Sequence, residues 1–175
     1  HAAKLLGRPV KWTDERSGSF LSDAHGRDHE VEAELALDAG GNFLAVRLTS
    51  YANMGAWLSS VAPLMGTGNF FKNVQSNYTT PAIEVVTKCL VTNTTPVSAY
   101  RGAGRPEGNY FMERLIETAA RETGRDPIAL RKLNHIRPDA FPFSAPSGSV
   151  YDSGDFSALL DQALELSLIH ISEPT

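Results

Sequence analysis

Strict alternation of apolar and polar residues marks two neighbouring segments in the first third of the chain, residues 30–38 and 43–51. Every second position carries an apolar side chain, as a strand with one buried face requires. These side chains are Val31, Ala33, Leu35 and Leu37 in the first segment, and Leu44, Val46 and Leu48 in the second. The sequence Asp-Ala-Gly-Gly-Asn at 38–42 has turn composition, so the pattern predicts an antiparallel β-hairpin.

Two further segments have strand-like composition, and a long segment before the second has none. Apolar residues dominate 82–91, which predicts a strand buried on both faces, with Cys89 as a small core residue. Residues 8–13 predict a short strand with a proline near its start. Residues 52–80 are rich in Gly, Ser, Asn and Met without a sustained period, which predicts a long irregular loop with short helical turns. We expect its Phe70 and Phe71 to be packing residues.

Three helices are predicted in the second half of the chain, each begun by capping residues. They are expected from Pro106 to Gly124, over 128–135 after Asp126-Pro127, and over 156–166 after Asp155 or Ser153. Prolines and a glycine in residues 137–151 predict a loop. The fold class is therefore α+β: mixed strands with a β-hairpin, followed by a strand–glycine loop–helix unit and further helices.

Both ends of the sequence differ from what a complete domain predicts. Residues 1–7 are typical of the last turns of a helix that stops at Gly7, so we expect a fragment of a larger domain. Residues 167–175 break the preceding pattern and resemble translated adapter sequence. We expect them to be a non-native tail, and His170 is not considered as a ligand. The domain is then expected to span residues 1–166.

The composition of the chain excludes several kinds of binding partner and site. The formal net charge of −4 and the hydrophobic content of 42% are typical of a globular protein and argue against nucleic-acid binding. Cys89 is the single cysteine, so the chain forms no internal disulfide and carries no cysteine cluster for an iron–sulfur centre. No apolar run approaches the roughly 20 residues of a membrane helix, and no signal-peptide pattern is present. We expect a cytoplasmic protein without a membrane span.

A glycine-rich segment between the predicted strand and helix is the strongest candidate for chemistry. Residues 99–107 read Ala-Tyr-Arg-Gly-Ala-Gly-Arg-Pro-Glu. Glycines let backbone N–H groups approach a ligand, the start of a helix favours an anion, and Arg101 and Arg105 add positive charge. The dinucleotide fingerprint is disfavoured, because Gly108 comes one position late and a second helix follows instead of a strand. A nucleotide- or anion-binding site and a structural turn both stay open.

Two other polar features allow alternative interpretations. His25 and His29 would share a helix face and could bind zinc, but the alternation from residue 30 favours an extended chain. In that geometry the two histidines lie about 13 Å apart at roughly 3.3 Å per residue, so we expect a loop or the start of a strand. Arg16 follows two carboxylates, and both a solvated ion pair and an arginine that points into a site stay open.

Five motifs occur together in this sequence: Gly7–Trp12, Asn53–Ala56, Thr95–Glu107, Met112–Ile116 and Tyr151–Phe156. In order and spacing they resemble the molybdenum-cofactor-binding subunit of the xanthine dehydrogenase and aldehyde oxidase family. The resemblance is closest to large chains of the aerobic carbon monoxide dehydrogenase type, and it covers nearly all of residues 1–166.

The resemblance implies a molybdenum hydroxylase. Family members hold molybdenum through a pterin cofactor, usually a cytosine dinucleotide in bacteria, and hydroxylate a carbon centre with oxygen from water. Electrons leave through 2Fe–2S clusters to FAD on partner subunits or domains. By this resemblance we expect a small-molecule substrate, either an aldehyde or an aromatic heterocycle, and a full enzyme that is a dimer of heterotrimers.

The resemblance also assigns roles to residues. Arg101 matches the arginine that contacts the molybdenum centre without being a side-chain ligand of the metal. Tyr100, Gly102 and Gly104 belong to the same cofactor-binding loop. Arg16 matches a substrate-orienting arginine, whose catalytic role is to stabilise negative charge on the substrate oxygen.

Departures from the family pattern limit the expected chemistry. Gly102 stands where copper–molybdenum carbon monoxide dehydrogenases carry cysteine, so we expect no copper site and no carbon monoxide oxidation. Ala103 stands where xanthine-oxidising relatives carry phenylalanine, so this part of the substrate site is expected to accept a different or larger molecule. The family's catalytic glutamate, its general base, falls outside this sequence. We therefore expect the isolated chain to be inactive.

Overall fold

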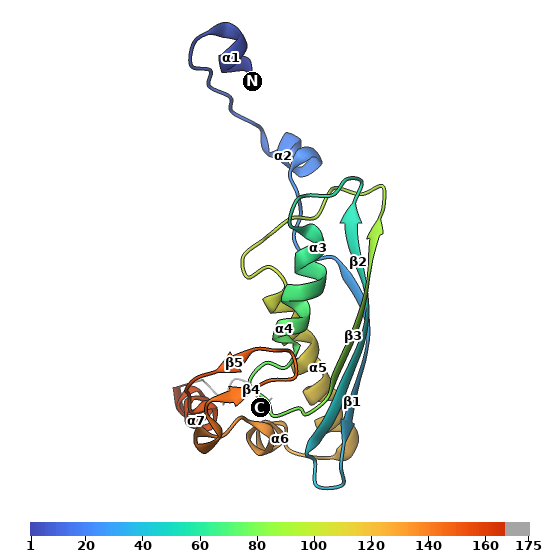
Figure 1. Ribbon diagram of the computed structural model, residues 1–175, viewed down its shortest axis with the longest axis vertical. Helices are drawn as coiled ribbons and strands as arrows, with labels where there is room; N and C mark the ends of the chain where they lie inside the picture. Colours follow the sequence, from blue (N-terminus) through green and yellow to red (C-terminus); the bar gives the residue numbers. More distant parts are fainter. Residues whose placement is uncertain (167–175) are drawn as a thin grey trace, which may run out of the picture.

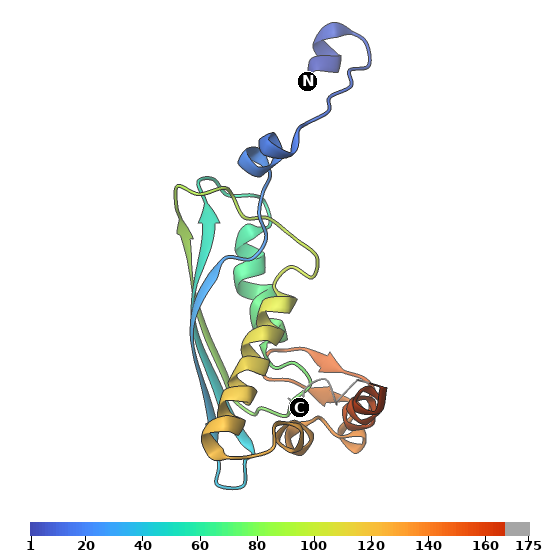
Figure 2. The same cartoon turned by 180° about the vertical axis from the view of Figure 1, so that it is seen from behind.

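The structure is a computed structural model that describes residues 1–166. The expected tail at 167–175, with His170, lies outside the described residues. A layer of helices covers one face of a three-stranded sheet, and a slender arm of residues 1–24 extends beyond it (Figure 1, Figure 2). This arrangement confirms the mixed fold of strands and helices that the sequence predicts.

The sheet has the order β1-β2-β3. Strands β1 (His29–Leu37) and β2 (Phe43–Gly55) form the predicted antiparallel hairpin, with Leu35 opposite Val46. Strand β3 (Ile83–Val91) runs parallel to β2. The alternating apolar residues of β1, with Val46 and Leu48 of β2, pack against the core, but the predicted Leu44 is exposed, because Phe43 takes the buried position next to the register shift at Ala36 and Leu37.

The connection from β2 to β3 is largely helical. It contains α3 (Ala62–Leu64), a π-helical turn η1 (Met65–Asn69) and α4 (Phe70–Val74). The short helical turns expected within 52–80 are confirmed, but the prediction that the rest is an irregular loop is wrong at 52–55, which belong to β2, and the turns form one continuous run over 62–74. Parallel strands require a crossover, and burial of Phe70 and Val74 against the sheet stabilises helix where the local composition does not favour it.

Helix α5 (Arg105–Thr123) is the long helix predicted after the glycine loop, and it ends at the left-handed Gly124. Helix α6 (Pro127–Asn134) follows the predicted cap, in which the Asp126 side chain accepts the N–H of Ala129 at 2.6 Å. The core lies between the sheet and helices α4 and α5. Its fully buried side chains include Leu48, Phe70, Val74, Met112 and Ile116.

The C-terminal part combines short elements with a third helix. The segment predicted as a loop contains a 3₁₀ turn η2 (Pro138–Ala140) and a small hairpin of β4 (Phe143–Ser144) with β5 (Val150–Tyr151). Helix α7 (Phe156–Leu166) has the predicted bounds. Asp155 caps it by accepting the N–H of Ala158 at 2.9 Å, which resolves the alternative between Asp155 and Ser153.

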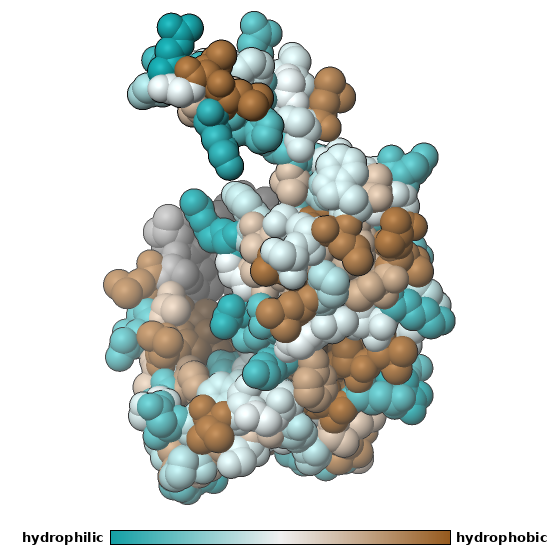
Figure 3. Space-filling view, turned by 45° about the horizontal axis from the view of Figure 1, so that its top comes forward, coloured by the Kyte–Doolittle hydropathy of each residue, from teal (hydrophilic) through white to brown (hydrophobic). Residues whose placement is uncertain are grey.

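The arm contains α1 (Ala2–Leu6), which ends at the left-handed Gly7 as predicted, and α2 (Arg16–Ser22). Neither helix buries a residue, and Trp12 between them is 83% exposed. Figure 3 shows the arm standing apart from the body, with apolar and polar side chains intermixed. The strand predicted at 8–13 is wrong, because no described strand lies beside this segment to pair with it. Arg16 accordingly begins a helix instead of following a strand.

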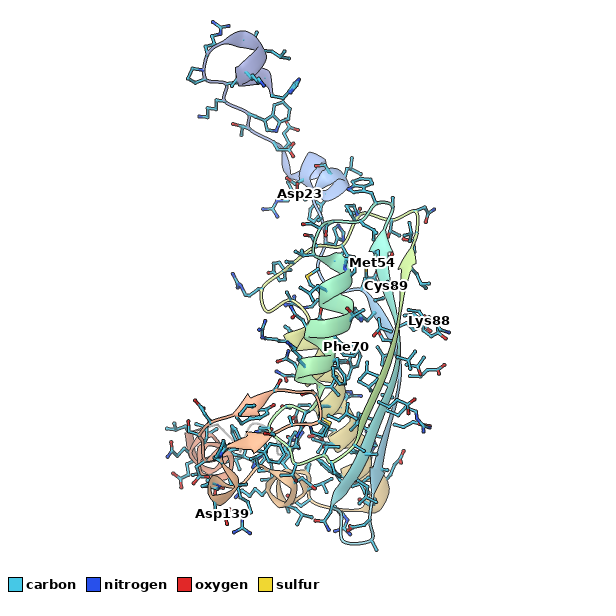
Figure 4. The ribbon with its side chains drawn as sticks, in the orientation of Figure 1. Asp23, Met54, Phe70, Lys88, Cys89 and Asp139 are labelled. Carbon is cyan, nitrogen blue, oxygen red and sulfur yellow. The ribbon has the colours of Figure 1, made fainter. Side chains whose placement is uncertain are left out.

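Strand β3 is more exposed than the sequence predicts. Cys89, labelled in Figure 4, is exposed, as are Val86, Leu90 and Val91. The prediction of a strand buried on both faces is wrong, because β3 is an edge strand and the helices cover only its first half. No helix within residues 1–166 is both long enough and apolar enough to cross a membrane.

Candidate cofactor-binding site

The glycine loop, residues 100–104, joins the segment after β3 to the start of α5. Gly102, Ala103 and Gly104 have φ angles of +89°, +37° and +93°. Glycine adopts this left-handed region at little cost, which explains why two of these three residues are glycines. The backbone therefore turns sharply just before the helix, and the first turn of α5 meets the loop.

Each carbonyl from Tyr100 to Ala103 accepts a hydrogen bond from the protein. Arg27 Nη2 donates to the carbonyls of Tyr100, at 3.4 Å, and Arg101. The N–H of Arg105 donates to Gly102 at 3.2 Å, and Asn69 Nδ2 donates to Ala103 at 3.1 Å. The acceptors of the loop are thus satisfied from the protein side.

The N–H groups of the loop divide into two sets. Those of Ala103 and Gly104 donate to the Tyr100 carbonyl at 3.0 Å and to Glu107 Oε2 at 3.1 Å. Those of Tyr100, Arg101 and Gly102 have no acceptor among the described residues. The three residues are exposed, and the N–H groups of Arg101 and Gly102 lie within the turn itself, where they are available to a ligand.

Positive charge accompanies these donors. The exposed Arg101 side chain makes no hydrogen bond or ion pair with the described residues. The Arg105 guanidinium lies over the loop, where Nη1 is 3.4 Å from the Gly102 carbonyl oxygen. The start of the 19-residue helix α5 adds its own partial positive charge. Together these groups suit an anion.

Close packing beneath the loop fixes its position. A Cβ on Gly104 would lie 2.7 Å from the Met65 carbonyl oxygen and 2.8 Å from Asn69 Cβ. Glu107 is buried, and its Oε2 lies 3.8 Å from Arg27 Nε. The loop therefore rests directly on η1, with a buried carboxylate on its inner side.

A cavity of about 730 Å³ separates α2 from the loop. Arg16 and Tyr100 line it, together with Phe20, His25 and Arg27. The structure thus brings two of the predicted site residues to one cavity. Arg101, Gly102 and Gly104 do not line it, and Ala103 borders a separate small pocket of about 10 Å³ next to Met65 and His29.

His25 and His29 lie at the start of the sheet, as expected. His25 forms a parallel bridge with Val97, and His29 is the first residue of β1. Burial lowers the pKa of His29, whose Nδ1 lies 3.1 Å from Ser50 Oγ. No group of three or more His, Cys, Asp or Glu side chains within residues 1–166 is arranged to hold a metal ion.

Sequence reasoning missed two residues that shape the site. Glu107 closes the segment 99–107 and has no role in the sequence analysis, yet it accepts the Gly104 N–H and faces Arg27. Arg27 lies 73 and 74 residues from the carbonyls that it binds, and no local pattern predicts a contact across that separation.

Comparison with known protein families shows which family this chain belongs to. The profile described as "Molybdopterin cofactor-binding domain" matches residues 1–135, which include the whole loop, α2 and α5. The chain belongs to this family. Membership of the molybdopterin cofactor-binding family confirms the resemblance that the sequence motifs indicate.

Individual relatives agree with the family assignment. The carbon monoxide dehydrogenase large chain of Hydrogenophaga pseudoflava is 32% identical over 94% of this chain and 21% of its own length. The 6-hydroxypseudooxynicotine dehydrogenase complex subunit gamma of Paenarthrobacter nicotinovorans is 33% identical over the same shares. Quinoline 2-oxidoreductase from Pseudomonas putida 86 superposes with a TM-score of 0.87 at 31% identity, again over 94% of this chain and 21% of that one. The chain spans about a fifth of the length of these oxidoreductases.

Proposed function

We propose that this chain is the part of a molybdenum hydroxylase that holds the anionic end of a molybdenum–pterin cofactor with its glycine loop. The observation that carries the proposal is the pair of exposed N–H groups of Arg101 and Gly102, beside the Arg101 guanidinium, which pairs with no carboxylate in residues 1–166. Oxo groups and phosphates are acceptors that such donors bind. The residues present therefore fit the cofactor of the family.

The bound cofactor supplies the oxidation of a substrate carbon with oxygen from water. The chain's own contribution is orientation and charge: the loop positions the anionic group, and Arg101 balances its charge. We further propose the cytosine dinucleotide form of the pterin, with 2Fe–2S and FAD centres on partner subunits in a dimer of heterotrimers. Support for partner subunits comes from relatives named as a large chain and as subunit gamma of a complex. The cytoplasmic location stays a prediction from the sequence.

For the substrate we propose an aldehyde or an aromatic heterocycle. Arg16 lines the cavity shared with Tyr100, where its guanidinium can stabilise negative charge that develops on a substrate oxygen. The relative that acts on quinoline supports the heterocyclic class. Ala103 would leave room where a larger side chain would restrict the substrate. Gly102 offers no thiolate for copper, so we propose no carbon monoxide oxidation, although one relative is a carbon monoxide dehydrogenase.

Metal and pterin analysis of the complete gene product tests this function. We expect stoichiometric molybdenum and a released pterin nucleotide. A purified, folded protein that contains neither would overturn the molybdenum assignment and leave an anion-binding module without molybdenum chemistry as the alternative.

Substitution of Arg101 tests the loop within that function. Arg101→Ala in the full-length enzyme is expected to lower turnover about 100-fold, as loss of one charge-stabilising donor does in other active sites, while folding is retained. Arg114→Ala, at an exposed arginine of α5, is the matched control and should leave turnover unchanged. Equal turnover in the two variants would count against the role of Arg101.

A further inference from the structure

We propose that Arg27 is the positioning residue that turns the N–H groups of Arg101 and Gly102 toward the cofactor. The inference rests on the proposed function and deepens it, since it names the residue that holds the cofactor loop in its binding conformation. Arg27 is outside the loop and acts through the backbone of the loop.

The argument begins with the two peptide groups on which Arg27 acts. Its Nη2 donates to the carbonyls of Tyr100 and Arg101. Both peptide bonds are trans, so each carbonyl points away from the N–H of the following residue. Holding these two carbonyls on the Arg27 side therefore directs the N–H groups of Arg101 and Gly102 to the opposite side. Neither of these N–H groups has an acceptor among the described residues.

Successive N–H groups that point to one side form a concave anion site. The Arg101–Gly102 peptide group could rotate if its carbonyl were free, because the φ angle of Gly102 lies in a region that glycine leaves easily. The Ala103 N–H also holds the Tyr100 carbonyl, at 3.0 Å, whereas among the described residues the Arg101 carbonyl is held by Arg27 alone, so the guanidinium is what prevents rotation of the Arg101–Gly102 peptide group. Arg27 thus pre-organises the site before the cofactor arrives.

Arg27 is itself held in place from two sides. Its guanidinium carbon lies 4.9 Å from the centre of the Tyr100 ring, and its Nε lies 3.8 Å from the buried Glu107 carboxylate. Glu107 in turn accepts the N–H of Gly104, so one ion pair connects both ends of the loop. The backbone of Arg27 has φ +57°, a conformation unusual for a residue with a long side chain. Asparagine or glycine would suit that backbone better, so the side-chain contacts explain why arginine occupies the position.

The test compares Arg27→Met, which removes all donors, with Arg27→Lys, which keeps charge and donors, in the full-length enzyme with its partner subunits. Arg125→Gln is the matched control, because its guanidinium also donates to a backbone carbonyl, that of Ala39, but at the hairpin turn. The readouts are molybdenum per subunit after dialysis and the electron paramagnetic resonance spectrum of Mo(V). Neither depends on turnover.

We expect Arg27→Met to retain molybdenum about 10- to 100-fold less tightly and to change the Mo(V) spectrum, as loss of other outer-shell partners of metal sites does. Arg27→Lys should recover most of the retention, and Arg125→Gln should match the wild type. If Arg27→Met does not fold, Arg27→Gln replaces it, since that side chain is too short to reach both carbonyls.

Full retention with an unchanged spectrum in the variant without donors would overturn the role of Arg27 and leave the proposed function standing. Equal losses in Arg27→Met and Arg27→Lys would also overturn it, because side-chain shape and not hydrogen bonding would then matter. A wild-type enzyme without molybdenum would overturn the proposed function itself, and this inference with it.

Discussion

Backbone conformation at single residues decides which groups the loop presents. Gly102 and Gly104 adopt φ angles that favour glycine, and Ala103 between them lies at +37°. A Cβ on Gly102 would lie 2.9 Å from the Pro106 ring, so a side chain at this position would require the Pro106 ring to shift. The conformation of this loop is therefore the one that suits glycine.

Gly104→Ala is expected to destabilise the chain more than Gly124→Ala. Both residues have positive φ, which costs a residue with a Cβ about 1–2 kcal/mol. A Cβ on Gly104 also meets the Met65 carbonyl and Asn69, which adds about 1–3 kcal/mol of overpacking, whereas nothing lies within 4 Å of a Cβ on Gly124. Urea unfolding of the two variants measures the difference. Equal urea midpoints for Gly104→Ala and Gly124→Ala would contradict this expectation, because the loop would then be able to move away from η1.

At the scale of elements, the crossover between β2 and β3 supports the loop. A Cβ on Gly108 would lie 2.9 Å from the Asn73 carbonyl carbon, so α5 approaches the backbone of α4 closely. Asn69, where η1 meets α4, donates to the Ala103 carbonyl. The position of the glycine loop therefore depends on a segment 30 to 40 residues earlier in the chain, which packs against the same sheet.

Phe70→Ala is expected to cost about 3–5 kcal/mol in the free energy of unfolding. Its ring is fully buried and lies 5.6 Å from the His29 ring and 5.7 Å from that of Phe111, so it joins the crossover to β1 and α5 (Figure 4). The adjacent Phe71 is only half-buried, and Phe71→Ala is the control with the smaller expected loss. Denaturant unfolding of the two variants measures both losses in the free energy of unfolding. A larger loss for Phe71→Ala than for Phe70→Ala would contradict the assignment of Phe70 as the core residue.

The two faces of the sheet have different roles in the whole molecule. The face toward α4 and α5 carries the core, and the other face is exposed, with charged residues beside the apolar Val86 and Leu90 of β3. There Arg47 on β2 lies between Glu34 on β1, at 3.1 Å, and Glu84 on β3, at 3.0 Å. These pairs are exposed and contribute little stability, but they satisfy charges across all three strands. Only one face thus anchors the helices that present the loop.

Stability of the whole chain is expected to fall as the pH decreases from 7.5 to 5.5. Burial lowers the pKa of His29 and of His135, and this effect exceeds the attraction that Glu107 and Glu113 exert on the protonated rings. The unfolded chain therefore binds more protons than the native chain once the pH falls through the ordinary histidine pKa of about 6.5. Protonation favours unfolding in that range.

Urea midpoints at the two pH values measure this dependence. His29→Gln combined with His135→Gln should reduce the difference between the midpoints, and His25→Gln, at an exposed residue, is the control substitution. A pH dependence that is unchanged in the double variant would assign the effect to other groups.

Local patterns in the sequence were sufficient for the elements whose stability is local. Alternation determined the β1–β2 hairpin, because a two-residue period with one apolar face fits a half-buried strand and no helix. Capping chemistry at Pro106, Gly124 and Asp126 determined the bounds of α5 and α6, because end groups of a helix are satisfied by neighbours in sequence. The motifs also determined the family, which the domain match confirms.

Only the tertiary structure decided what depends on distant neighbours. Composition could not show that 62–74 is helical, since its burial comes from packing against α5 and the sheet. Nor could it show that Cys89 is exposed, since that depends on where the helical layer ends. For the loop, the sequence determined its glycines and its charge. The orientation of the Arg101–Gly102 peptide group depends on Arg27, 74 residues away from Arg101, and a hydrogen bond across that separation leaves no local pattern.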